Sequence, residues 1–126
     1  MRRVPAGLLA ATALVVGASG CAQREPEVSF AKDVQPLLDV RCGSCHMPGG
    51  PGTEASGLST QGYEALMKGT KFGPVVIPGD ALSSALNMLV EGRADPSIRM
   101  PHGDQPLTAA EQTMLRRWVE QGAKNN

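Results

Sequence analysis

The run Cys42-Gly43-Ser44-Cys45-His46 constrains this chain more than any other feature. A C-x-x-C-H run is the attachment signature of a c-type haem, in which two thiols form thioether bonds to one porphyrin. The histidine that follows supplies the proximal nitrogen ligand of the iron. One turn of chain must therefore present two sulfurs at the edge of the ring and an imidazole at its centre. The motif predicts one covalent haem c, with its iron, held by Cys42, Cys45 and His46.

Two other interpretations of the paired cysteines fit the sequence less well. A zinc site normally needs four protein ligands, and the chain has no second pair of cysteines. A thioredoxin-like redox motif is expected beside a βαβ pattern, which this sequence lacks. A disulfide between Cys42 and Cys45 in a haem-free chain is the weaker alternative, and a covalent-haem stain that survives denaturation would exclude it.

Residues 1–20 have the pattern of a secretory signal peptide. Arg2 and Arg3 precede a short apolar run over 8–16, and small residues follow that run. The apolar run is shorter than a membrane-spanning helix requires. We therefore expect an exported protein, with an uncleaved N-terminal anchor as the alternative.

The four residues Ala18-Ser19-Gly20-Cys21 resemble the lipobox of bacterial lipoproteins. The resemblance implies a lipid on Cys21, followed by a polar tether over 21–28; the alternative is a free thiol. Several acyl chains together give stable anchoring. We expect the protein on the periplasmic side of a bacterial membrane. Ala22 favours the outer membrane, by analogy with lipoprotein sorting in enteric bacteria.

The composition fits one small domain and argues against nucleic acid as a partner. The chain has 126 residues, enough for one domain. Its formal net charge is zero and it has no basic stripe, which a nucleic-acid-binding surface would need. One Trp, one Tyr and two Phe are a poor aromatic inventory. That leaves room for a large planar apolar group in the core.

The patterning predicts an all-α domain over 29–126. Ser29 is placed to cap a first helix, which Pro36 should kink or restart. The run Val75-Val76-Ile77 is too isolated to form a sheet and should line the core as an extended segment. Thr108 and Glu111 form the pattern of a capping box before the last helix. Further segments are expected as loop at 47–57, helix at 61–68 capped by Thr60, helix at 81–91 capped by Asp80, irregular chain at 93–106, and helix up to 121.

A carbonyl at Pro48 or nearby in the loop could accept the second ring N–H of His46 and fix its orientation. In the predicted helix 81–91, Leu82, Leu86 and Leu89 belong to the expected buried stripe.

Met100 is the favoured candidate for the ligand opposite His46. Most other methionines lie in predicted helices, where they are ordinary core residues. Met100 lies in an irregular loop, and Pro101 biases it away from helical dihedral angles. Met and His together are the typical ligands of cytochromes c. His102 is the alternative ligand, and Arg99 is either a partner of a haem propionate or a solvated loop charge.

These residues together resemble a small class I cytochrome c domain, and more narrowly the planctomycete-type cytochrome C domain. The resemblance rests on several matching stretches of the sequence. They are Ser29-Phe30-Ala31-Lys32-Asp33-Val34-Gln35-Pro36-Leu37-Leu38, Arg41-Cys42-Gly43-Ser44-Cys45-His46, Gly57-Leu58, Tyr63-Glu64-Ala65-Leu66, Val76-Ile77-Pro78-Gly79-Asp80, Arg99-Met100-Pro101, Leu107-Thr108 and Arg117-Trp118-Val119.

The resemblance implies four to five helices around one covalent haem. It implies thioethers at Cys42 and Cys45, and His46 and Met100 as axial ligands. It also implies that the first and last helices pack together, with Phe30 near Trp118. The long Gly/Pro insertion after His46 departs from the family pattern.

The function expected from these features is one-electron transfer by a monomeric, membrane-tethered carrier rather than catalysis. Its partners would be redox proteins near the same membrane. One alternative is a haem subunit of a larger dehydrogenase complex. Another is a haem enzyme or gas sensor with an open distal site, which would follow if Met100 is not a ligand.

Overall fold

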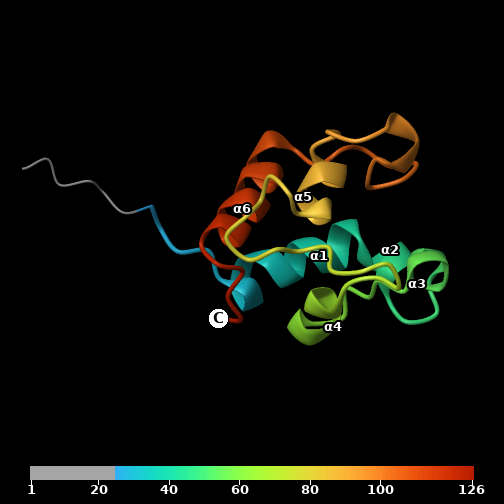
Figure 1. The fold of residues 1–126 in the computed structure, drawn as a ribbon, viewed down its shortest axis with the longest axis horizontal. Helices are drawn as coiled ribbons and strands as arrows, with labels where there is room; N and C mark the ends of the chain where they lie inside the picture. Colours follow the sequence, from blue (N-terminus) through green and yellow to red (C-terminus); the bar gives the residue numbers. More distant parts are fainter. Residues whose placement is uncertain (1–24) are drawn as a thin grey trace, which may run out of the picture.

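The computed structural model describes residues 25–126, and in that range the regular structure is helical, with no β-strand (Figure 1). The all-α prediction is therefore confirmed. The elements in chain order are a π-helical turn η1 (Phe30–Val34), α1 (Gln35–Arg41), α2 (Gly43–His46), α3 (Pro51–Ser56), α4 (Tyr63–Lys68), α5 (Ala85–Val90), a 3₁₀ turn η2 (Pro96–Ile98) and α6 (Ala109–Glu120). The predicted signal peptide, Cys21 and the first part of the tether lie outside the described residues.

The first helical segment begins and restarts where the sequence indicated. The Ser29 hydroxyl oxygen accepts from the Lys32 amide at 3.2 Å, and the Ser29 amide donates to the Asp33 carboxylate at 2.8 Å. The chain then changes from a π-helical turn to α-helix, with Pro36 in the first turn of α1. Proline is tolerated there because amides of the first turn have no intrahelical partner. Local capping chemistry thus directs the chain into the cysteine motif.

Three aromatic rings join the two ends of the described chain. The centroids of Phe30 and Trp118 are 5.5 Å apart, and those of Phe30 and Tyr63 are 5.2 Å apart with nearly perpendicular planes. The Trp118 indole N–H donates to the Lys124 carbonyl at 3.0 Å, and the Tyr63 hydroxyl donates to the Ala123 carbonyl at 2.8 Å. Phe30 and Trp118 are buried. The predicted packing of the first helix on the last is confirmed.

The described part of the predicted tether, residues 25–28, lies against α6 and the C-terminal residues. The Val28 amide donates to the Gln121 side chain at 2.8 Å, and Val28 is buried. Lys124 pairs with Glu27 at 2.5 Å. Residues 25–27 are therefore exposed but bonded to α6 and the C-terminal residues, and Val28 belongs to the core.

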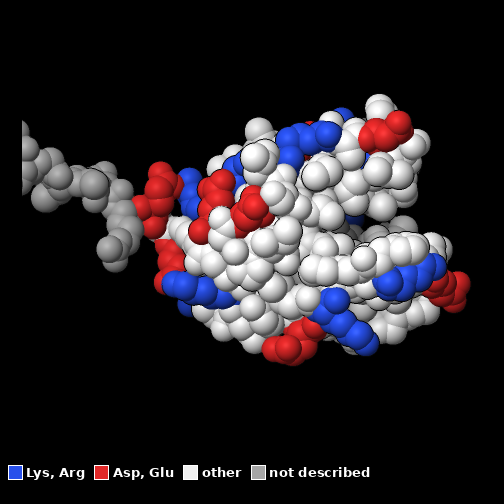
Figure 2. Space-filling view, viewed as in Figure 1, with Lys and Arg blue, Asp and Glu red and all other residues white. Residues whose placement is uncertain are grey.

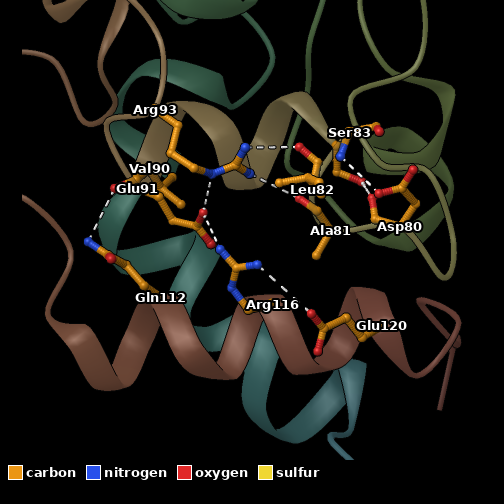
Figure 3. Close-up of polar contacts among 11 residues, drawn as sticks. Asp80, Ala81, Leu82, Ser83, Val90, Glu91, Arg93, Gln112, Arg116 and Glu120 are labelled. Carbon is orange, nitrogen blue, oxygen red and sulfur yellow. Dashed lines mark hydrogen bonds and ion pairs between the residues drawn. The ribbon is translucent and has the colours of Figure 1, made fainter.

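Helix α6 begins at the predicted capping box and holds α5 in place. The Thr108 hydroxyl oxygen accepts from the Glu111 amide, and the Glu111 carboxylate accepts from the Thr108 amide. The Glu91 carboxylate, just after α5, accepts from Arg93 at 2.5 Å and from Arg116 of α6 at 2.6 Å (Figure 3). A nearly buried carboxylate between two guanidinium groups fixes the position of α5 on α6.

The structure corrects three predicted segments, of which two adjoin the cysteine motif. The region 47–57 is not loop throughout, because α3 forms within it, with Pro51 in its first turn and Gly57 in the left-handed conformation at its end (φ 81°). Proline at the start and glycine after the end are the usual helix boundary residues. Helix α4 has Gly62 as N-cap instead of Thr60, which is buried and donates its amide to the His46 carbonyl at 2.8 Å.

The helix predicted over 81–91 begins only at Ala85. The Asp80 carboxylate accepts from the Ser83 amide at 2.9 Å, which closes a turn instead of capping a long helix. Leu82 is consequently 67% exposed and does not belong to a buried stripe. In the preceding segment Val75 and Val76 are buried as expected, and the Val75 carbonyl accepts from the Leu86 amide, whereas Ile77 is 41% exposed and does not line the core. In the described range, no helix has the length and apolar character needed to cross a membrane.

Candidate functional site

Cys42, Cys45 and His46 lie on one short turn between α1 and the end of α2. The amides of Cys45 and His46 donate to the Cys42 carbonyl at 3.1 and 2.9 Å, so the turn is closed by its own backbone. Positions three and four apart lie on the same side of a helical turn. Both cysteines are free thiols and half-buried. The motif therefore presents two sulfurs and one imidazole on the same side of the chain.

His46 is held by the carbonyl of Leu58. The distance from Nδ1 to the Leu58 oxygen is 3.3 Å, and the His46 side chain is buried. When Nδ1 carries the proton and donates it to this carbonyl, the lone pair of Nε2 is free to bind a metal. The sequence placed this carbonyl at Pro48 or nearby. The structure places it at Leu58, because the intervening residues fold into α3 and return the chain to the imidazole only after that helix.

Two adjoining cavities open beside the motif, with volumes of about 110 and 400 Å³. Cys42, His46, Ser56 and Met100 line both of them. The smaller cavity is strongly apolar; its further lining includes Leu58, Val75, Leu86, Leu89 and Val90. Figure 2 shows the surface hollowed between the lobe of residues 93–106 and the lobe that carries α2 and α3. The site is an apolar hollow with the cysteine motif in its wall.

Met100 reaches this hollow from the opposite lobe. Its side chain is half-buried, and its amide donates to the Leu89 carbonyl at 3.3 Å. His102 is exposed and lines only the larger cavity, together with Cys45 and Asp104. The structure thus brings all four predicted haem-binding residues to one hollow. Which side chain faces His46 across a bound group stays a prediction.

Arg41, the last residue of α1, connects the Met100 lobe to this helix, which ends directly before the motif. One of its guanidinium nitrogens donates to the carbonyls of Gln105 and Pro106 at 2.7 and 3.1 Å, and Nε lies 3.7 Å from Glu111. The sequence showed Arg41 only as part of a family-like motif. Its partners are backbone carbonyls more than sixty residues away, which no sequence pattern reveals. Arg41 fixes the distance between the two walls of the hollow.

Arg99 lines neither cavity. Its guanidinium lies close to Gly92, where a Cβ would meet the guanidinium carbon at 3.0 Å. Its Nε is buried without a hydrogen-bond partner among the described residues. The pairing of Arg99 with a propionate therefore stays a prediction.

Burial makes the Cys42 thiol a poor ligand for a metal ion by itself. Burial raises the pKa of the Cys42 thiol to about 11, and the Arg41 charge offsets only part of that effect. A thiol must lose its proton to bind a metal, whereas a thioether sulfur needs no charge. Across residues 25–126, no group of three or more His, Cys, Asp and Glu side chains could hold a metal ion.

No model of a known protein family matches the chain, and no curated protein matches its sequence. Among solved structures, the chain is similar to part of the hydrazine synthase of Kuenenia stuttgartiensis, with a TM-score of 0.53 and 22% sequence identity. The match covers 76% of this chain and 16% of that chain. This likeness shows a shared small helical fold.

Proposed function

We propose that this chain is a monohaem c-type cytochrome that carries single electrons. The observation that carries the proposal is the meeting of Cys42, Cys45, His46 and Met100 at one apolar hollow. Three of these residues come from a single turn, and Met100 comes from a lobe more than fifty residues later. Sequence spacing alone does not require that meeting.

The residues present fit a haem. Cys42 and Cys45 would form the two thioethers, His46 would bind the iron through Nε2, and the Met100 sulfur would bind it from the other side. The haem, when bound, supplies the exchange of one electron between ferric and ferrous iron. The apolar side chains that line the two adjoining cavities suit a porphyrin, which is large, planar and apolar.

The protein's own part would be to hold the ligands still. The Leu58 carbonyl fixes the tautomer and the ring orientation of His46. Arg41 holds the Met100 lobe against α1, and the Glu91 network holds α5, whose Leu86, Leu89 and Val90 line the hollow. A pocket that moves little between the two oxidation states favours fast transfer of the electron.

We further propose the setting in which this carrier works. Lipidation at Cys21 would keep it at the periplasmic side of a bacterial membrane, with the outer membrane favoured by Ala22. Its partners would be redox proteins near that membrane, and it would act as a monomer. The activity of the hydrazine synthase is not proposed for this chain, which matches 16% of that protein.

Optical spectra of the haem-loaded full chain test the proposal, with wild type compared with Met100→Ala. We expect the weak long-wavelength band of thioether-ligated ferric iron in wild type and its loss in the variant. We expect ferrous wild type to resist CO and the variant to bind it. A wild type that binds CO readily and lacks the band would replace the carrier proposal by the enzyme or gas sensor. A wild type without the band that still resists CO would assign the ligand to His102.

A reversible redox cycle with both ligands retained is the second requirement. Wild type should be reduced and reoxidised by small one-electron mediators without loss of the band. A haem subunit of a dehydrogenase would meet the same spectral test but would co-purify with its enzyme from the native membrane. Purification of the full chain alone, with the band intact, favours the independent carrier.

A further inference from the structure

The insertion after His46 makes a steric contact with the imidazole that the expected cytochrome chemistry does not explain. Gly52, in the first turn of α3, lies so close to the ring that a Cβ there would be 2.7 Å from Cε1 and 2.9 Å from Nε2 of His46. The same Cβ would be 2.9 Å from the carbonyl oxygen of Cys45. Separations below 3.0 Å require the neighbouring atoms to move. Gly52 has ordinary helical dihedral angles. Glycine is therefore required at position 52 because a larger side chain does not fit, and not because of the backbone conformation.

Hydrogen bonds hold the imidazole in place against this contact. On one side its Nδ1 is bound to the Leu58 carbonyl at 3.3 Å. Its own backbone carbonyl accepts from the Thr60 amide at 2.8 Å. The side chain is buried, at 8% exposure. A larger residue at position 52 would therefore displace the ring or α3 itself.

Helix α3 is fastened at both ends, so it is not free to yield either. At its start, the Thr53 hydroxyl donates to the Met47 carbonyl at 3.0 Å. At its end, the Ser56 hydroxyl donates to the Gly52 carbonyl at 2.6 Å and accepts from the Leu58 amide at 3.1 Å. Ser56 thus connects the glycine that touches the ring to the residue whose carbonyl holds Nδ1. Residues 50–58 form one unit, which we name the proximal clip.

We propose that the proximal clip sets the orientation of the His46 ring, with Gly52 as a positioning residue against Cε1 and Nε2 and the Leu58 carbonyl as the partner of Nδ1. The inference rests on the proposed haem function, since the ring matters as an iron ligand. Partners of a metal-bound histidine that fix its ring orientation tune the properties of the metal. Gly52 would act through His46 and not by touching the iron.

Gly52→Ala tests the clip, because intrinsic helix propensity and the steric contact predict opposite results. At helical dihedral angles alanine loses less conformational freedom on folding than glycine, so without the contact the variant should have a higher melting temperature. With the contact, we expect a lower melting temperature. We also expect a shift in the ferric electron paramagnetic resonance g values and in the reduction potential. The optical band of Met100 ligation should remain. Glu54→Ala, at an exposed position of the same helix, is the control and should leave the g values unchanged.

Ser56→Ala is the second variant, for the case in which Gly52→Ala yields no haem-loaded protein. It adds no atoms, and it removes the hydroxyl that links Gly52 to Leu58, at a residue that also lines both cavities. We expect it to shift the g values in a chain that still folds and binds haem. The clip is overturned if Gly52→Ala is more stable than wild type and keeps the wild-type g values. It is also overturned if Gly52→Ala yields no haem-loaded protein and haem-loaded Ser56→Ala has unchanged g values. A wild type without haem overturns the proposed function and the clip together, so the two failures are distinguishable.

Discussion

Replacing Arg41 with alanine should release the lobe that carries Met100 from α1, the helix that ends directly before Cys42. The guanidinium donates to two carbonyls of that lobe, those of Gln105 and Pro106, at 2.7 and 3.1 Å. A hydrogen bond from a charged donor contributes roughly 1.5–3 kcal/mol. The side chain is 19% exposed, so water competes for its hydrogen bonds, and its Nε is buried without a hydrogen-bond partner. Both effects reduce the contribution of the two hydrogen bonds to stability. We expect a net loss of about 2–3 kcal/mol for the pair of bonds.

That loss has a local readout at the Met100 amide, which donates to the Leu89 carbonyl. Since 1.4 kcal/mol corresponds to a factor of ten in an equilibrium, opening of the lobe should become roughly 30- to 150-fold more frequent. Native-state hydrogen exchange at Met100 measures this directly. Urea denaturation of the same sample gives the change in the free energy of unfolding.

Two further variants separate the hydrogen bonds from the charge. Arg41→Lys keeps the charge but loses the forked geometry, and it should resemble Arg41→Ala more than wild type. Glu111→Gln removes the ion pair at 3.7 Å and can keep the capping box, so it should change exchange by only a few fold. The reasoning is refuted if Arg41→Ala leaves exchange at Met100 within about threefold of wild type, a change worth less than one such bond.

Three other predictions follow from the fold. Glu91→Ala leaves two guanidinium groups without their shared carboxylate and should lower the free energy of unfolding by about 2 kcal/mol in urea; a loss below about 0.5 kcal/mol would contradict it. The Thr108 amide holds the pKa of the Glu111 carboxyl below 4.5, so its stabilising effect is present above pH 4.5 and is lost as the pH falls through the folded-state pKa. Wild type should therefore lose stability below pH 4.5 more steeply than Glu111→Gln, and equal slopes would refute this. In haem-free protein at pH 8, Cys42 should be alkylated about 100-fold more slowly than an ordinary exposed cysteine, and the rate should rise with pH up to about pH 11. Peptide mass mapping measures the rate of alkylation. A fast reaction at pH 8 would contradict the burial of the thiol.

The parts of the fold that the sequence predicts are those set by local chemistry. The capping box at Thr108 and Glu111 and the restart at Pro36 depend on neighbours within four residues, and both are confirmed. The contact of Phe30 with Trp118 is confirmed as well, although only the family resemblance implied it.

The errors come from residues whose role depends on position within a turn. Pro51 and Gly57 indicated a loop, but at the start and after the end of a helix they are favourable residues, and α3 lies between them. Aspartate is a favoured N-cap residue, yet the Asp80 carboxylate closes a turn with Ser83. A side chain that can cap a helix can also close a turn, and tertiary packing decides between them.

In the candidate site, the side chains could be predicted and the backbone contacts could not. The cysteine motif and the Met100–Pro101 pair are visible in the sequence, and the structure brings them to one hollow. The Leu58 carbonyl that holds His46 is a backbone atom, and every residue has one. The need for glycine at position 52 arises only when α3 lies against the imidazole.

The most direct test of this account is the intact mass of the denatured full chain, produced in a host that assembles c-type haem. Wild type should carry the mass of one haem through denaturation and stain for covalent haem, and the variant with both Cys42→Ser and Cys45→Ser should carry none. A denatured wild-type chain with the mass of the polypeptide alone would contradict the central claim.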